Sequence, residues 1–141
     1  MSDPILEVRD LHVTFPARGG GTARAVDGVD LVVPRGEVVA LVGESGCGKT
    51  TLARAILGLV KPDSGEVRFE GKPLPGDARA LKPYRRQVQM VFQDPMGALN
   101  PRQTVYEAVA EGLRVQRTGG DERARVAEAL ARAGLRPPER F

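Results

Sequence analysis

The order of hydrophobic and polar residues in the first half of the chain predicts strands followed by a loop and a helix. Residues 5–15 and 25–33 mix apolar and polar positions as strands do, and a glycine-rich loop joins them over 16–24. Residues 38–42 are a short, β-branched apolar run, which is typical of a buried parallel strand. Residues 51–59 place apolar side chains at helical spacing, so a helix is expected there.

The middle of the chain predicts two further strands with a short helix between them. Residues 66–71 alternate between apolar and polar positions, and residues 87–92 form a second strand-like segment. The polar stretch at 78–86 favours a short helix. Residues 94–102 are rich in Pro, Gly and Asn, which indicates a loop.

Two helices with recognisable start signals are expected near the end of the sequence. Thr104 stands three residues before Glu107, which is the spacing of a capping box, and the helical pattern continues to about residue 116. Asp121 is placed to cap a last helix that continues to about residue 133. The second half of the chain therefore ends in helices rather than strands.

The segment between the strand at 38–42 and the next helix carries the most specific motif of the chain. Residues 43–50, GESGCGKT, fill every fixed position of the phosphate-binding P-loop, G-x-x-x-x-G-K-[ST]. The glycines let the backbone curl so that its N–H groups converge on phosphate oxygens, and a helix N-terminus adds further donors. The candidate nucleotide-binding residues are Gly43, Glu44, Ser45, Gly46, Cys47, Gly48, Lys49, Thr50 and Thr51.

Lys49 and Thr50 carry the specific chemistry expected of this loop. Lys49 brings a positive charge to the β- and γ-phosphates, and the Thr50 hydroxyl is the expected magnesium ligand. The alternative is a glycine-rich turn that meets the pattern by chance, although the strand and helix expected on either side favour the functional interpretation. Cys47 is either reactive, because a helix N-terminus favours thiolate, or simply a small residue tolerated in the loop.

The composition indicates a globular domain without a membrane span. The 141 residues are 41% hydrophobic and 28% charged, and no apolar run approaches the roughly 18 residues that a span requires. No secretory signal peptide is recognised at the N-terminus. Cys47 is the only cysteine, so no internal disulfide is expected and a reducing cytoplasm is the natural setting.

The charge pattern gives little support for nucleic-acid binding. The net charge of +3 comes from scattered basic residues, and aromatic residues make up only 4% of the chain. We therefore expect no nucleic-acid partner. His12 is the only histidine, and its strand context predicts a partly exposed surface residue rather than a catalytic one.

Several motifs together resemble the ATP-binding cassette, the motor subunit of ABC transporters. The P-loop at 43–51 resembles the Walker A motif of that family, and residues 91–95, VFQDP, resemble its Q-loop. Residues 98–105, with 25–29 and 54–59, are similar to the branch that imports oligopeptides, dipeptides and nickel. The resemblance covers nearly the whole chain, and the paired Walker A and Q-loop motifs are highly specific.

The resemblance implies an α/β fold of the P-loop NTPase class, in the form of an incomplete ATP-binding cassette. The chain would hold antiparallel β strands, the start of the parallel core sheet and the start of the helical subdomain. A nucleotide-binding core over 1–93 would end at the Q-loop, and 94–141 would begin the helical subdomain.

The resemblance also implies roles for individual residues. Lys49 would bind the phosphates of ATP, and Thr50 and Gln93 would bind Mg2+. Gln93 would also contact the attacking water and report the nucleotide state to the membrane subunit, whereas the alternative for it is an ordinary loop glutamine. Phe15 matches the aromatic residue that stacks on adenine, a position often occupied by Tyr, and its alternative is an apolar side chain packed in the core.

As a member of that family, the protein would be the ATPase subunit of an importer for peptides or similar small solutes. Its partners would be transmembrane permease subunits and a second ATP-binding subunit, identical or different. It would lie in the cytoplasm, peripherally on the inner face of the membrane. A different P-loop enzyme, such as a small kinase or GTPase, is a further alternative, but the segment Gln93-Asp94-Pro95 argues against it.

Four elements of a full cassette are not among the 141 residues: the LSGGQ signature, the Walker B aspartate, the catalytic glutamate and the switch histidine. The resemblance therefore implies the N-terminal piece of a protein about twice as long, without catalytic residues of its own. The alternative is a truncated, non-catalytic nucleotide-binding remnant. Either way, we expect the 141 residues expressed alone to be inactive in hydrolysis and poorly soluble, because apolar faces would lack neighbouring strands.

Overall fold

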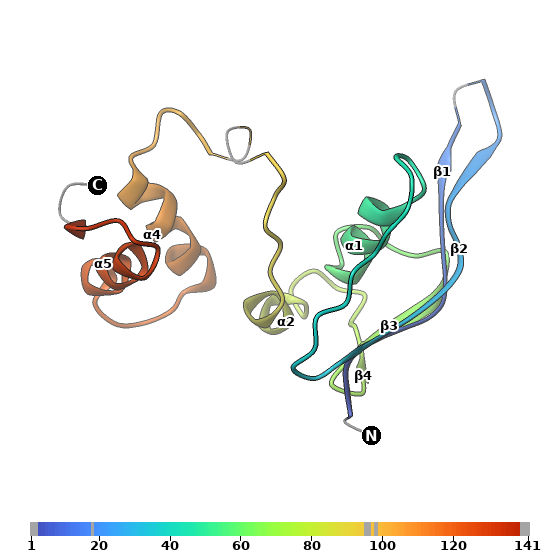
Figure 1. The fold of residues 1–141 in the computed structure, drawn as a ribbon, viewed down its shortest axis with the longest axis horizontal. Coiled ribbons are helices and arrows are strands. Elements are labelled where there is room, and N and C mark those ends of the chain that lie inside the picture. Colours follow the sequence, from blue (N-terminus) through green and yellow to red (C-terminus); the bar gives the residue numbers. More distant parts are fainter. Residues whose placement is uncertain (1–2, 18, 95–96, 98, 139–141) are drawn as a thin grey trace. The chain divides into compact units, whose positions relative to one another are not determined.

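The computed structural model divides the chain into two compact units, residues 1–89 and 90–141, which are described separately. The first unit contains a β-sheet with helices α1 and α2, and the second contains helices α4 and α5 (Figure 1). The residues that the structure describes are 3–17, 19–94, 97 and 99–138.

The first unit is built on a four-stranded antiparallel sheet with the strand order β2-β1-β3-β4. The strands are β1 (Pro4–Pro16), β2 (Thr22–Pro34), β3 (Ser64–Phe69) and β4 (Lys72–Pro73). The central strand β1 pairs with β2 along one edge and with β3 along the other. The strands expected at 5–15, 25–33 and 66–71 are thus confirmed within a few residues.

A bulge in β1 explains why its hydrophobic positions do not alternate strictly. Val8 and Leu11 are both buried although they stand three residues apart. Asp10 between them has a φ of 44°, and the register with β2 shifts at this point. Such a bulge adds one residue to the strand, so both apolar side chains reach the same face. The Asp10 N–H donates to a carboxylate oxygen of Asp30 in β2 at 2.9 Å, which fixes the bulge.

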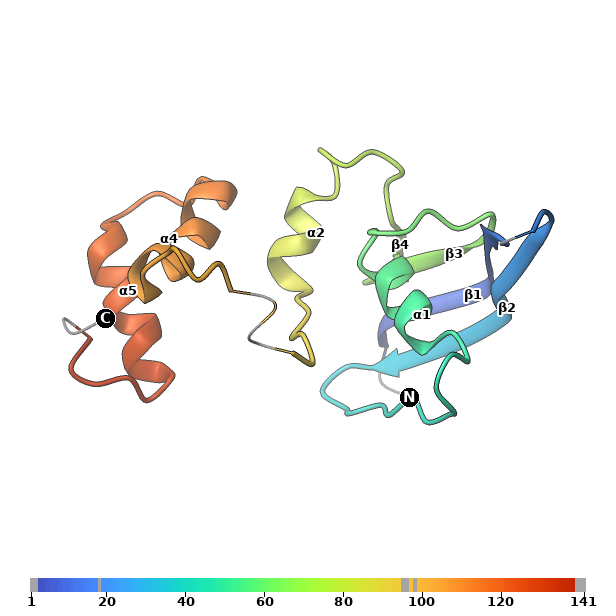
Figure 2. The same ribbon diagram turned by 90° about the horizontal axis from the view of Figure 1, so that it is seen from above.

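Helix α1 (Lys49–Ile56) packs on one face of this sheet (Figure 2). Its Leu52 and Ala55 are buried, which confirms the helical spacing seen in the sequence. Together with the sheet they form one apolar cluster. Its buried members are Val8, Leu11, Val13, Val26, Leu52, Ala55 and Val67. This cluster holds the start of α1, and with it the end of the glycine-rich loop, against the sheet.

Helix α2 (Lys82–Gln87) is tied to the C-terminal end of α1. The Tyr84 hydroxyl donates to the carbonyl of Ile56 at 2.7 Å, and burial raises the pKa of Tyr84 to about 12. The Arg85 guanidinium donates to a carbonyl just after α1 at 2.8 Å, where a cation favours the helix end. The helix expected at 78–86 is therefore present but starts later, because the residues before Lys82 form a turn.

Two segments that the sequence predicted as strands, 38–42 and 87–92, are not strands in this structure. Within the described part of the chain, neither segment pairs with another strand. Val38, Val42 and Val91 are consequently 98%, 95% and 96% exposed. A parallel strand exists only with hydrogen-bonding neighbours, and every pair of strands observed here is antiparallel. The start of a parallel core sheet that the sequence predicted is therefore not seen among the described residues.

In the described part of the second unit, the helices α4 (Val105–Gln116) and α5 (Glu122–Arg132) pack against each other. Their contact is formed by the buried side chains of Ala110, Val126 and Leu130. The two helices begin and end close to where the periodicity and the cap residues predicted them. Figure 1 shows them joined by a short connection.

Both helices of the second unit begin at the caps that the sequence predicted. The Thr104 hydroxyl accepts from the Glu107 N–H at 3.1 Å, and the Glu107 carboxylate accepts from the Thr104 N–H at 2.8 Å. The Asp121 carboxylate accepts from two N–H groups in the first turn of α5, at 2.9 and 3.2 Å. The hydrogen bonds of Thr104 lower the pKa of Glu107, because they stabilise its ionised form.

We expect Thr104→Ala to lower the free energy of unfolding by about 1 kcal/mol, because it leaves an N–H of the first turn of α4 without its side-chain acceptor. Urea denaturation followed by helical circular dichroism measures this loss. Thr104→Ser keeps the hydroxyl and is the matched control, with stability close to that of the parent. Equal stability of the alanine and serine variants would contradict the role of the cap.

Candidate nucleotide-binding site

The P-loop at residues 43–50 leads directly into the N-terminus of α1. Gly48 is the last residue before the helix, with a φ of 94°, and its carbonyl accepts the first helical hydrogen bond from the Leu52 N–H at 2.9 Å. Because this cap position is a glycine, the donors of the first turn are free to meet an external acceptor. The positive end of the helix dipole therefore lies where a phosphate is expected.

Two glycines of the loop closely approach other atoms, one of them a backbone atom that leaves no room for a side chain. A Cβ built on Gly48 would lie 2.0 Å from the carbonyl oxygen of Ala25, so the loop touches the backbone of β2 at this point. A Cβ on Gly43 would lie 2.8 Å from Sγ of Cys47 across the loop. The first approach is to the backbone of β2 outside the loop, and the second is to the end of the Cys47 side chain inside it. The sequence analysis recognised the role of these glycines in the loop, but it could not show which atoms lie next to them.

The Lys49 ammonium lies within the turn of the loop. Its Nζ donates to the carbonyl oxygens of Gly43 at 2.7 Å and of Glu44 at 2.6 Å, and to Sγ of Cys47 at 3.3 Å. An ammonium has three N–H donors, so these contacts match its full capacity. The arrangement places a positive charge among the loop residues, at the start of α1. A phosphate bound there would exchange some of these contacts for charge-assisted bonds.

The remaining loop residues are open to a ligand in this structure. Glu44, Ser45, Cys47 and Thr50 are exposed, and Thr51 is half-buried in the first turn of α1. Among the described residues, no group of three or more His, Cys, Asp or Glu side chains is arranged to hold a metal ion. A magnesium site at Thr50 would thus be of the kind that uses one protein ligand with phosphate oxygens and water.

The two predicted residues outside the loop lie in different units. Phe15 is near the end of β1, opposite Ala23 of β2, and is 40% exposed. The alternative that Phe15 packs in the core is therefore wrong, and adenine stacking stays a prediction. Gln93 is exposed in a bend of the second unit, whereas the P-loop belongs to the first. Its roles in magnesium binding and signalling also stay predictions.

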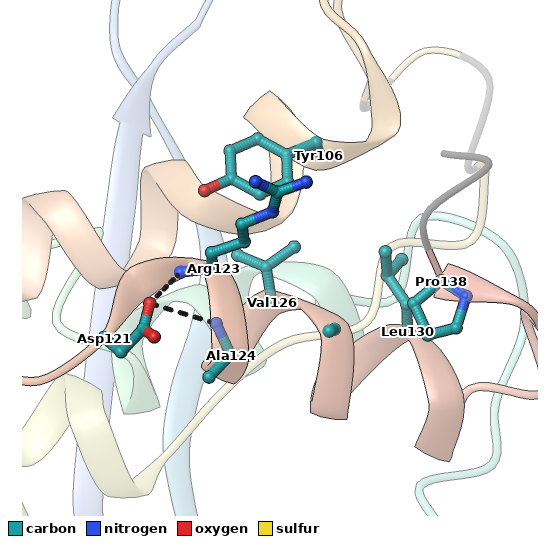
Figure 3. A pocket seen from close by; sticks show the side chains of 8 residues that line it. Tyr106, Asp121, Arg123, Ala124, Val126, Leu130 and Pro138 are labelled. Carbon is teal, nitrogen blue, oxygen red and sulfur yellow. Dashed lines mark hydrogen bonds between the residues drawn. The ribbon is translucent and has the colours of Figure 1, made fainter.

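The second unit contains a cavity that the sequence did not predict. It has a volume of about 590 Å3 and lies between Tyr106 of α4 and residues of α5, including Val126 and Leu130 (Figure 3). Figure 3 also shows the hydrogen bonds by which Asp121 caps α5 at its edge. Nothing in the spacing of these residues distinguishes a cavity from an ordinary helix contact.

A glycine-rich loop that enters a helix N-terminus beside a β-sheet defines the class of P-loop nucleotide-binding proteins. The particular family follows from comparison with known proteins. The family model described as ABC transporter matches residues 26–140. The chain belongs to the ABC transporter family, as the Walker A and Q-loop resemblance predicted.

Its curated relatives include ATP-binding proteins of peptide transport. The chain is 44% identical over 145 residues to the oligopeptide transport ATP-binding protein OppF of Salmonella typhimurium, covering 94% of this chain and 43% of the relative. It is 39% identical over 145 residues to the oligopeptide transport ATP-binding protein AppF of Bacillus subtilis, with 96% and 44% covered. The chain thus spans less than half the length of these relatives.

Solved structures of ATP-binding cassettes share the fold. The cbiO1 protein of Clostridium perfringens, part of the ABC transporter complex cbiONQ, matches with a TM-score of 0.75 and 33% identity, over 96% of this chain and 52% of that one. The cassette MJ0796, in a dimeric form bound to ADP and Pi, matches with a TM-score of 0.76 and 28% identity, over 94% and 58%. The fold is therefore that of a partial ABC cassette.

None of the helices in the described part of the chain combines the length and the apolar character that crossing a membrane requires.

Proposed function

We propose that this chain binds ATP with Mg2+ as part of the ATP-binding subunit of an ABC importer for peptides or similar small solutes. The observation that carries the proposal is the position of the Lys49 ammonium inside a tightly curled loop, at the uncapped N-terminus of α1. This site offers a fixed positive charge, backbone N–H donors and a nearby hydroxyl, which are the groups that a triphosphate with magnesium requires.

Each predicted residue has a role in this proposal. Lys49 and the N–H groups of residues 43–51 would bind the phosphates, and Thr50 would contribute its hydroxyl to the Mg2+ ion. Gln93, whose amide both donates and accepts, would complete the magnesium environment in the whole protein. The magnesium ion would supply charge neutralisation on the phosphates. Phe15 would stack on the adenine, for which its exposure leaves it available.

The proposed partners are transmembrane permease subunits and a second ATP-binding subunit. Support comes from relatives: OppF and AppF are named as transport ATP-binding proteins, cbiO1 is part of a transporter complex and MJ0796 forms a dimer. With these partners the protein would lie peripherally on the inner face of the membrane. Hydrolysis coupled to transport is proposed for the whole protein, because the relatives are more than twice as long as this chain.

The test of this function is the binding of ATP, GTP and tripolyphosphate, each with Mg2+, in a titration calorimeter. We expect all three to bind at the loop, and the two nucleotides to bind more tightly than tripolyphosphate, because only the nucleotides offer a base to Phe15. Turnover of ATP by the same sample then shows whether these residues hydrolyse as well as bind. Absence of binding by all three ligands would refute the proposal.

Phe15→Ala is expected to weaken ATP binding about five-fold, which corresponds to the loss of one base–aromatic stack. Phe15→Tyr keeps the ring and should bind ATP like the parent protein. Tripolyphosphate has no base, so its affinity should be the same for the parent and both variants. A uniform loss of affinity for tripolyphosphate and ATP in Phe15→Ala would instead show that Phe15 supports the fold of the hairpin.

A further inference from the structure

The side chain of His12, the only histidine of the chain, lies between two carboxylates of the first unit. Its Nε2 is 3.0 Å from a carboxylate oxygen of Asp10, and its Nδ1 is 3.1 Å from a carboxylate oxygen of Asp27. A neutral imidazole has one N–H donor, whereas an imidazolium has two. A carboxylate only accepts, so both contacts are hydrogen bonds at once only when His12 is protonated.

The groups around His12 favour its charged form. The charged side chains that contact the His12 ring are Asp10 of β1 and Asp27 of β2. Further from the ring, Arg24 donates to Asp27, and the carboxylates of Asp30 and Asp63 accept from the backbone N–H groups of Asp10 and Thr14. The pKa of His12 is raised from its ordinary value of 6.5, chiefly by the hydrogen bond to Asp10, and burial opposes this shift. The pKa of Asp27 is lowered, first by Arg24 and also by His12.

His12 stands where the sheet narrows from three paired strands to two. The pairing of β1 with β3 ends at His12 and Ser64, but the pairing of β1 with β2 continues to Pro16 and Thr22. Beyond the buried pair Val13 and Val26, the hairpin is a two-stranded ribbon, which Figure 1 shows extending past β3. Such a ribbon is marginally stable by itself. The ribbon carries Phe15, so the stability of the ribbon determines how firmly that aromatic side chain is positioned.

A second set of hydrogen bonds fixes the backbone next to His12, at the end of the pairing between β1 and β3. The Asp63 N–H donates to the His12 carbonyl at 2.9 Å, and the Asp63 carboxylate accepts from both the N–H and the hydroxyl of Thr14. Gly28 faces the His12 ring, with a Cβ built there lying 3.5 Å from both the ring and the Asp10 carboxylate. The imidazole therefore occupies a defined place between β1 and β2 rather than a free surface position.

We propose that His12 is a proton-dependent clamp between β1 and β2, which holds the two-stranded end of the hairpin more tightly when protonated than when neutral. Because the pKa of His12 is raised in the folded chain, its contribution is fully present below about pH 6.5. The contribution is lost as the pH rises through the folded value. Deprotonation leaves the ring with one N–H, so His12 can donate to Asp10 or to Asp27 but no longer to both. Only the contact with Asp27 joins β1 to β2, because Asp10 lies on β1 itself, and this link is therefore weakened in the neutral form.

The first test is a titration of the His12 ring by NMR with labelled histidine, which is unambiguous in a chain with one histidine. We expect a midpoint above 6.5, lowered in both Asp10→Asn and Asp27→Asn. Asp77→Asn, which changes a carboxylate outside the sheet, should leave the midpoint in place. A midpoint at or below 6.5, or one that neither variant at Asp10 and Asp27 moves, would overturn the proposal.

The second test is amide hydrogen exchange of the hairpin end, residues 14–15 and 22–24, corrected for the intrinsic effect of pH. We expect protection to fall about two- to five-fold as the pH passes the His12 midpoint, the range typical of exposed ion pairs. His12→Gln should abolish this step, and the amides of residues 6–8, which lie between two strands, should show none. A pH-independent protection in the parent protein would refute the clamp.

A consequence for ATP affinity rests on the proposed function, because it requires Phe15 to contact the nucleotide. Affinity should fall as the pH rises through the His12 midpoint, and the comparison with His12→Gln removes the titration of ATP itself. Ring titration and hydrogen exchange use the nucleotide-free chain. If ATP fails to bind, the proposed function fails while those two measurements still decide the clamp.

Discussion

Lys49→Ala is expected to weaken ATP binding by about ten- to a hundred-fold. The ammonium is the fixed positive charge of the loop, and each charge-assisted hydrogen bond that it makes contributes about 1.5–3 kcal/mol. In the structure it also joins the two ends of the loop, through the carbonyls of Gly43 and Glu44 and the thiol of Cys47. Its removal therefore takes away both a phosphate ligand and an internal support of the loop.

Calorimetric titration with ATP and Mg2+ measures this loss directly. Lys72→Ala is the matched control, because Lys72 is an exposed lysine in β4 and not part of the loop. It should bind ATP like the parent protein. An unchanged ATP affinity in Lys49→Ala would show that Lys49 does not bind the nucleotide. An equal loss in both variants would mean that net charge, rather than this ammonium, attracts the nucleotide.

Elements with a local chemical signal were predicted well from the sequence. Thr104 and Glu107 cap each other within one turn of α4, and Asp121 caps the first turn of α5. The same holds for α1, which was expected at residues 51–59 and spans Lys49–Ile56. In each case the residues that determine the element lie within a few positions of one another, so their interaction is visible in the order of the residues.

Elements that depend on distant partners were predicted less well. The apolar segments 38–42 and 87–92 have the composition of strands, but a strand also needs a neighbour, and none is paired with them among the described residues. The bulge at Asp10 likewise depends on Asp30, which lies 20 residues further on. A hydrophobic pattern indicates which residues are buried, but it does not indicate which segments pair with each other.

The candidate site was likewise predicted well where the signal is local and poorly where it depends on distant residues. The P-loop motif identified residues 43–51 correctly as a glycine-rich loop that opens a helix. It did not show that Gly48 touches Ala25 or where the Lys49 ammonium is held. His12 was expected to be ordinary partly exposed surface, and its exposure is intermediate, but its two carboxylate partners come from a bulge and a neighbouring strand.

Gly48→Ala is expected to lower the free energy of unfolding of the first unit by about 2–4 kcal/mol and to weaken ATP binding as well. Part of this cost is the left-handed backbone, since Gly48 has a φ of 94°. The rest comes from the Ala25 carbonyl, which lies 2.0 Å from the position of the new Cβ. Backbone atoms cannot rotate away as a flexible side chain does, so the loop must move off β2.

Gly46→Ala separates these two costs, because Gly46 has a similar φ of 83° but its Cβ would meet nothing within 4 Å. We expect it to lose only about 1 kcal/mol, the cost of the backbone conformation. Urea denaturation and ATP titration of both variants measure the difference. A larger loss for Gly48→Ala means that contact with β2 holds the phosphate loop in shape. Equal losses would show that the loop is independent of the sheet, and that only its glycine conformations shape it.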